Sequence, residues 1–206
     1  MRSVTQVAAP PEPGLRERKK RATRRALQYA ALRLVAERGM DDVTVDEIAA
    51  AADVSPRTFF NYFATKEDAL SALDPDALAE NLEAIRARPA TETPLQALRE
   101  VYLARAARTS SDTEFWRLRA RVTRDYPHLL VTISGAAALA DHAVSKVLAE
   151  RMGVDPLTDP RPLLLAGAAS TARRAAMQLW LAGDQQRDLA DVLGECFDAV
   201  AHLARA

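Results

Sequence analysis

The sequence predicts an all-α protein, and three observations support this. Alanine, which has the highest helix propensity, occurs 42 times among 206 residues, against 7 glycines and 11 prolines. Apolar side chains from Leu27 to Val35 recur at spacings of three and four, the period of one helix face. No segment alternates apolar and polar residues between turn signals, as strands do. We therefore expect a compact N-terminal three-helix unit and a larger C-terminal helical bundle.

Capping and turn signals divide the first third of the chain. Residues 1–14 contain three prolines and a glycine and are expected to form a disordered leader. Gly39 suits the end of a first helix, and Thr44 with Glu47 forms a capping-box pair at the start of a second. Ser55 followed by Pro56 is typical of a third helix start, and Thr65 opens a fourth. These signals predict helices over 15–39, 44–51, 55–63 and 65–72.

The rest of the chain continues in the same pattern, broken only by short proline- and glycine-containing segments. We expect one domain over 15–72 and a second over 73–206. The second should contain helices over 76–88, 94–109, 113–126, 127–152, 160–183 and 186–204.

Composition and charge exclude several classes of protein. Hydrophobic residues make up 49% of the chain and charged residues 27%, values typical of a soluble globular protein. The 28 basic and 28 acidic side chains cancel, which excludes a globally basic nucleic-acid binder but not a locally basic one. The single cysteine, Cys196, excludes a disulfide framework and a cysteine-based zinc site. Because there is no long apolar run and no signal peptide, we expect a cytoplasmic protein without a membrane partner.

The predicted helix over 55–63 carries too many aromatic side chains for one buried face. Phe59 and Phe63 are four residues apart and should share the buried side. The other side then presents Arg57, Phe60 and neighbouring hydroxyl and amide groups. Arginine can read guanine through two hydrogen bonds, and an aromatic edge can meet the thymine methyl group. Two short helices joined by a turn at Asp53 indicate a helix-turn-helix; the alternative is a small helical corner without a ligand.

The segment TVDEIAAAADVSPRTFFNYFATKEDAL, residues 44–70, resembles the signature of TetR-family transcriptional regulators. Phe60 departs from the family pattern, which often has tyrosine there. The resemblance implies DNA binding, with base-reading positions at Ser55, Pro56, Arg57 and Phe60. It also implies phosphate contacts from Thr44, Thr58, Asn61, Tyr62 and Lys66.

A basic stretch in the first helix extends this expected interface. Residues 16–25 contain seven basic side chains and one acidic side chain. Beside a DNA-reading unit, we expect Arg21 and Arg24 to contact phosphates without sequence preference. The alternative is an ordinary solvated charged face.

By the same resemblance, the C-terminal bundle should form a homodimer and bind a small effector. Segment 163–181 is rich in small residues, and 186–204 carries an apolar stripe of Leu189, Val192, Leu193, Cys196, Val200 and Leu203. Paired helices of this kind would make a four-helix interface, with packing inside one chain as the alternative. The C-terminal part of the chain also resembles that of actinobacterial TetR regulators thought to bind acyl-CoA-like ligands. A candidate pocket comprises Phe115, Trp116, Arg119, Val122, Tyr126, Ile133, Met177 and Trp180, although an aromatic stripe of this kind is more often plain core.

These features favour a repressor released from a palindromic double-stranded operator by a small apolar effector. A ligand-independent dimeric DNA-binding protein is the first alternative. An enzyme is a remote one: His128, His142 and His202 are scattered, and there is no phosphate-binding glycine loop or nucleophile elbow. We expect no catalytic residue, no metal site and no cofactor.

Overall fold

The computed structural model describes residues 14–71, 74–109, 112–183 and 186–203, and in these ranges it is helical with no strand. The predicted all-α class is confirmed. The chain forms two compact units that meet at the start of α4, one ending at Lys66 and the other beginning at Glu67. The predicted leader over 1–14 lies, apart from Gly14, outside the described residues.

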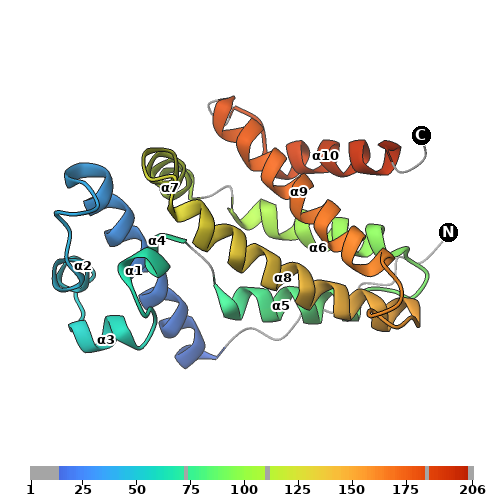
Figure 1. Ribbon diagram of the computed structural model, residues 1–206, viewed down its shortest axis with the longest axis horizontal. Coiled ribbons are helices and arrows are strands. Elements are labelled where there is room, and N and C mark those ends of the chain that lie inside the picture. The colour runs from blue at the N-terminus through green and yellow to red at the C-terminus, as the bar shows by residue number, and fades with distance from the viewer. Residues whose placement is uncertain (1–13, 72–73, 110–111, 184–185, 204–206) are drawn as a thin grey trace. The chain divides into compact units, whose positions relative to one another are not determined.

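The N-terminal unit is built from α1 (Leu15–Arg38), α2 (Val45–Ala51) and α3 (Pro56–Phe60), and ends as α4 (Lys66–Ser71) begins. Figure 1 shows α2 and α3 on the same side of the longer α1. α1 stops at Gly39, whose φ of 98° is readily adopted only by glycine and whose amide donates to the Val35 carbonyl at 2.9 Å.

The predicted capping residues occupy the predicted positions. The Thr44 hydroxyl accepts from the Glu47 amide at 3.3 Å, while the Glu47 carboxylate accepts from the Thr44 amide at 2.8 Å. Ser55 caps α3 through the Thr58 amide at 3.2 Å. The regular part of α3 ends at Phe60 rather than near residue 63, because the following amides turn back by three residues.

One apolar core holds these short helices together. Helices of five to seven residues are unstable alone and depend on such packing. Phe59 and Phe63 are buried as predicted, their ring centroids 5.6 Å apart. The other buried apolar side chains of the unit are Leu27, Ala30, Ala31, Leu32, Val35, Met40, Val43, Ile48 and Ala49.

The second unit continues from α4 through six further helices. These are α5 (Pro75–Ala87), α6 (Pro94–Thr109), α7 (Thr113–Asp125), α8 (Leu129–Met152), α9 (Arg161–Ala182) and α10 (Leu189–Leu203). Within this unit, α8 packs between α5 and α9, and α10 packs on α6 and α9 (Figure 1). Side-chain caps start several of these helices: Asp74 accepts from the Asp76 amide at 3.1 Å, and Asp188 from the Ala190 amide at 2.8 Å.

The core of the second unit corrects one expectation about the last two helices. Leu189, Val192 and Leu193 are at most 4% exposed and pack against Phe197 and the alanines of α9. Four of the α9 alanines, Ala166, Ala169, Ala172 and Ala176, are equally buried. These seven residues of the expected subunit interface therefore fill the core of their own chain instead, whereas Leu203, at the end of the predicted stripe, is 74% exposed.

None of the helices in the described ranges is long and apolar enough to cross a membrane.

Candidate nucleic-acid interface

α3 presents a polar and aromatic surface on the side away from its buried ring. Phe59 is fully buried, whereas the adjacent Phe60 is 57% exposed, and the two rings meet edge to face at 5.5 Å. Arg57 and Asn61 are also exposed. An exposed phenylalanine beside exposed hydrogen-bonding groups is unusual for a surface without a partner, because apolar area favours burial.

Arg57 is the most available cation on this surface. Among the described residues, no hydrogen bond, ion pair or ring contact engages its guanidinium. The five donors of this group are therefore open to an external acceptor. Its position in the first turn of α3 matches the part of a recognition helix that approaches base edges in the major groove.

The hydroxyl residues beside Arg57 are used in local capping. Ser55 Oγ and Thr58 Oγ1 lie 2.9 Å apart, and Thr44 Oγ1 donates to the Glu47 carboxylate at 2.9 Å. Thr44 and Ser55 remain exposed, whereas Thr58 and Tyr62 are half-buried. Any phosphate contact from these hydroxyls has to share or replace the bonds that shape the helix ends.

The predicted cations of α1 differ from one another in the structure. Arg21 is half-buried with its Nε 4.0 Å from the Glu17 carboxylate. Arg24 has its guanidinium carbon 4.7 Å from the Phe63 ring centroid and donates to the Tyr62 carbonyl at 3.2 Å. Arg24 thus packs α1 onto the segment after α3, and its expected phosphate contact stays a prediction.

Sequence reasoning missed an ion pair beneath the α2 N-terminus. Arg38 Nη2 lies 2.8 Å from the Glu47 carboxylate and donates to the Asp42 carbonyl at 2.5 Å. Hydrogen bonds from the Thr44 backbone, Arg38 and the Thr44 side chain, in that order, lower the pKa of Glu47 to about 2. The capping box was visible in the sequence, but no local spacing indicated that Arg38 would join it.

Lys66 is half-buried and faces the inside of the N-terminal unit. Its ammonium donates to the Met40 carbonyl at 2.7 Å and to the Val43 carbonyl at 3.1 Å. Two of its three donors are therefore in use. The phosphate contact implied for Lys66 by family resemblance stays a prediction. The observed bonds tie Lys66 to the turn after α1.

The predicted effector residues fall into two groups. Trp116 and Met177 pack against the main core of the second unit together with buried Trp180, while Arg119 lies over the Trp116 ring at 5.4 Å. Phe115 and Val122 are buried, whereas Tyr126 and Ile133 are half-buried outside that core. Arg119 also donates to the Ser71 carbonyl at 3.2 Å. The residues thus lie on the expected helices, with Tyr126 just past the end of α7, and their role as a pocket stays a prediction.

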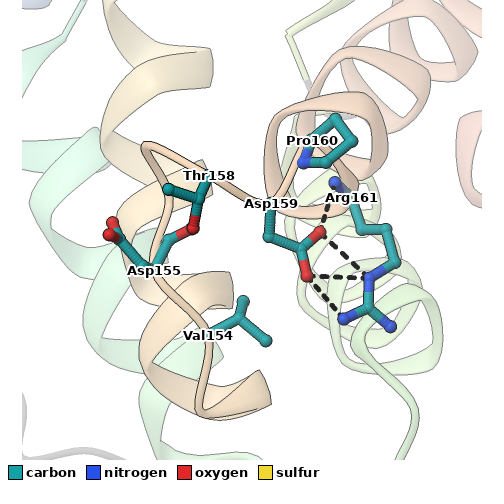
Figure 2. A pocket seen from close by; sticks show the side chains of 6 residues that line it. All are labelled: Val154, Asp155, Thr158, Asp159, Pro160 and Arg161. Atoms are coloured by element: carbon teal, nitrogen blue, oxygen red, sulfur yellow. Dashed lines mark hydrogen bonds and ion pairs between the residues drawn. The ribbon is translucent and has the colours of Figure 1, made fainter.

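A surface hollow of about 550 Å³ lies elsewhere, at the loop between α8 and α9. Figure 2 shows the Asp159 carboxylate and Arg161 guanidinium paired on one side, with Asp155 and Thr158 opposite. The Asp159 pKa is lowered by its hydrogen bond from Arg161. Because the hollow is open and its charged pair is mutually satisfied, it offers little to hold a ligand.

A two-helix reading head on a small core, joined to a larger helical unit, is the architecture of a helix-turn-helix DNA-binding regulator. Comparison with known proteins identifies the family. Residues 29–73 match the bacterial regulatory proteins of the tetR family, and residues 92–204 match the MftR C-terminal domain. The chain belongs to the TetR family of bacterial transcriptional regulators.

Individual relatives cover most of the chain. The HTH-type transcriptional regulator TcmR of Streptomyces glaucescens is 33% identical over 84% of this chain and 79% of its own length. MftR of Mycobacterium tuberculosis, whose name assigns it to mycofactocin biosynthesis, is 30% identical over 89% of this chain and 91% of its own. The repressor FadR of Thermus thermophilus, solved in complex with lauroyl-CoA, is 26% identical with a TM-score of 0.51, covering 86% of this chain and 93% of that one.

Proposed function

We propose that this regulator is a homodimeric repressor that binds a palindromic operator through α3 and is released by an apolar effector. The exposed, unengaged guanidinium of Arg57 beside the exposed Phe60 ring is the observation that carries the DNA-reading part. Arg57 reads a guanine and Phe60 contacts a thymine methyl group, with Ser55 and Pro56 beside them. Thr44, Thr58, Asn61, Tyr62, Arg21 and Arg24 provide the surrounding phosphate contacts.

An uncharged stripe on α9 supports the homodimer. Leu164 is 67% exposed and Leu179 is 60% exposed, and the positions between them on the same face are uncharged. At the spacing of one helix face, this outer stripe consists of Leu164, Ala168, Thr171, Ala175, Gln178, Leu179 and Ala182. Cys196, Ala199 and Leu203 form a similar stripe on the adjacent α10. Two helices with such faces from each copy would pair as a four-helix interface.

The effector is proposed to be an apolar, acyl-containing molecule. The lauroyl-CoA bound by FadR, a relative at 26% identity, is a ligand of this class. Trp116, Met177 and Trp180 provide apolar walls in the second unit, and Arg119 provides a cation next to Trp116. An acyl chain with a phosphate-bearing head group suits such a combination.

The DNA-reading proposal is tested by selecting binding sequences from a random duplex pool and measuring affinity by fluorescence anisotropy. The enriched sequence is expected to be palindromic. Arg57→Ala should weaken binding to it by roughly 5- to 150-fold for each half-site, the loss of one bidentate base contact per subunit, and relax preference at one base pair per half-site. Arg33→Ala, an exposed arginine on α1, is the matched control and should bind normally. Equal losses for the two variants, or no enrichment, would contradict the proposal.

A further inference from the structure

The segment that contains α2 and α3 begins and ends at the same place in the N-terminal unit, the turn after α1. The chain turns at residues 40–43, runs through α2 and α3, and returns at Lys66. There the Lys66 ammonium donates to the carbonyls of Met40, 26 residues earlier, and Val43, 23 residues earlier, at 2.7 and 3.1 Å. Lys66 therefore closes a loop that contains the whole helix-turn-helix.

Arg38 also binds this turn. Its guanidinium donates to the Asp42 carbonyl and pairs with Glu47, the residue that completes the Thr44 capping box. Three of the four carbonyls between residues 40 and 43 thus accept hydrogen bonds from cationic side chains. We call residues 40–43, Arg38 and Lys66 the neck.

Charge-assisted hydrogen bonds of this length are stronger than bonds between neutral groups. The Lys66 ammonium is half-buried, so removing it would leave the Met40 and Val43 carbonyls without these donors in a poorly solvated place. Val43 and Met40 side chains are buried in the core, 1% and 5% exposed, which fixes the position of the turn further. The neck therefore sets how α2, and α3 after it, project from α1.

We propose that Lys66 is a positioning residue for the DNA-reading helices, acting through the neck. This inference rests on the proposed operator binding. A lysine that only contacts phosphate is expected to have an exposed ammonium in the absence of DNA. The Lys66 ammonium instead donates two hydrogen bonds within the protein in the absence of DNA.

The two roles predict a different dependence of operator affinity on salt concentration. A phosphate contact releases a counterion, so its loss lowers the slope of log affinity against log salt concentration by about 0.9 per subunit, or about 1.8 for the dimer, and weakens all sequences alike. Loss of a positioning bond reduces the fraction of molecules with α3 in the reading pose. That loss weakens operator binding at every salt concentration, leaves the slope unchanged, and spares nonspecific binding.

The experiment compares Lys66→Met with Lys146→Met, the same change at an exposed lysine of α8 in the second unit, which should leave operator binding unchanged. Lys66→Met should lose about tenfold or more in operator affinity, the scale of a hydrogen bond to a charged group, with a parallel salt plot and a reduced ratio of specific to nonspecific binding. Lys66→Arg, which can also donate twice, should recover most of the affinity. A slope reduced by about 1.8 for the dimer with an unchanged ratio would assign Lys66 to a phosphate, and normal operator affinity would remove its role altogether.

A second measurement needs neither DNA nor a folded variant. The chain has four lysines, Lys19, Lys20, Lys66 and Lys146, so nitrogen-detected NMR of the ammonium groups is simple to assign. In the wild-type protein without DNA, Lys66 should give a slowly exchanging ammonium signal that persists as salt is raised. A Lys66 signal that exchanges as fast as that of Lys19 would overturn the neck bonds themselves. If wild-type protein binds no operator while this signal is present, the proposed function fails and the neck does not.

Discussion

At the scale of single residues, the N-terminal unit uses its cations in two different ways. Arg24, Arg38 and Lys66 donate to carbonyls or pair inside the unit, whereas Arg57 is exposed and unengaged among the described residues. These side chains have the same charge, so composition does not separate them. The structure separates them by burial and by which donors are already used.

Asp53, in the turn between α2 and α3, allows a direct test of backbone strain. Its φ of 53° lies in the left-handed region, where a β-branched side chain is strongly disfavoured and glycine is not. Asp53→Val should lower the free energy of unfolding by roughly 1–2 kcal/mol relative to Asp53→Gly. The measurement is urea unfolding followed by circular dichroism.

The control is Asp41, an exposed aspartate in the preceding turn whose φ is not positive. Asp41→Gly should not be more stable than Asp41→Val by the margin expected at Asp53, because glycine at this position only increases the conformational freedom of the unfolded chain. A Gly-over-Val preference of the same size at both positions would show that the turn at Asp53 is not strained.

At the scale of elements, most of the fold could be predicted because helix ends are determined by residues close to them in sequence. The Thr44–Glu47 box, the Ser55 cap and Gly39 are each decided by groups within four residues, and the structure has all three. The end of α3 could not be predicted as well, since Phe63 is buried and four residues after Phe59 whether or not the helix is regular between them. Local patterns specify faces better than they specify ends.

The neck shows where local reasoning stops. Lys66 and Met40 meet across 26 residues, and no periodicity links them. The same limit applies to α9 and α10, where sequence showed apolar and small residues but not which of them face the chain's own core. Leu189 and Leu164 look equally suited to an interface, and only the packing of α9 on α10 buries the first and exposes the second.

The α2 N-terminus should be sensitive to acid. A carboxyl whose pKa is lowered by folding stabilises the fold fully above its ordinary value and loses that contribution as pH falls toward the lowered one. For Glu47 this window runs from its ordinary 4.5 down to about 2. The protection factors of the α2 amides, from which the intrinsic pH dependence of exchange has been divided out, should therefore fall across this window in wild-type protein, because protonation removes the Arg38 pair and weakens the cap.

Glu47→Gln should have lower α2 protection factors than wild type at neutral pH, and these should change little across the same window, so that the two proteins converge near pH 2. Asp46→Asn, in the same first turn but outside the capping box, is the control and should keep the wild-type profile. A wild-type profile for Glu47→Gln would mean that the charge of Glu47 does not hold the α2 cap.

At the scale of the whole molecule, reading a palindrome requires two copies, and the α9 outer stripe is the surface proposed to join them. Leu164→Glu would place a charge in that interface. An uncompensated buried charge costs several kcal/mol, so dimer dissociation should rise by at least about a hundredfold. Sedimentation equilibrium measures this directly. Leu157→Glu, at a leucine 92% exposed in the loop before α9, should remain dimeric.

Operator binding should follow the oligomeric state. A monomer presents one reading head, so Leu164→Glu should bind the operator weakly at concentrations where Leu157→Glu binds normally. A dimer in the Leu164→Glu variant would place the subunit interface elsewhere on the molecule.

The proposed effector would release DNA by binding more tightly to the form of the proposed dimer that does not fit the operator. Reversing a population from 99:1 requires a preference of about 10⁴-fold, roughly 5.5 kcal/mol. Burial of an acyl chain contributes about 0.8 kcal/mol per methylene, but only the part that differs between the two forms counts. A minimum chain length is therefore expected, below which acyl-CoAs bind without releasing DNA.

The last prediction uses the two tryptophans of the second unit to find that length. Trp116 is half-buried under Arg119, and Trp180 is buried with its indole donating to the Arg187 carbonyl at 2.9 Å. Titration with acyl-CoAs of increasing length should change the fluorescence of Trp116 more than that of Trp180, since the fixed indole has less freedom to respond. Trp116→Phe and Trp180→Phe assign the signals, and operator anisotropy is followed in the same samples. A fluorescence response without release at any length would make the ligand a binder and not an effector. No response at any length would favour a packed core and a dimer that regulates without a ligand.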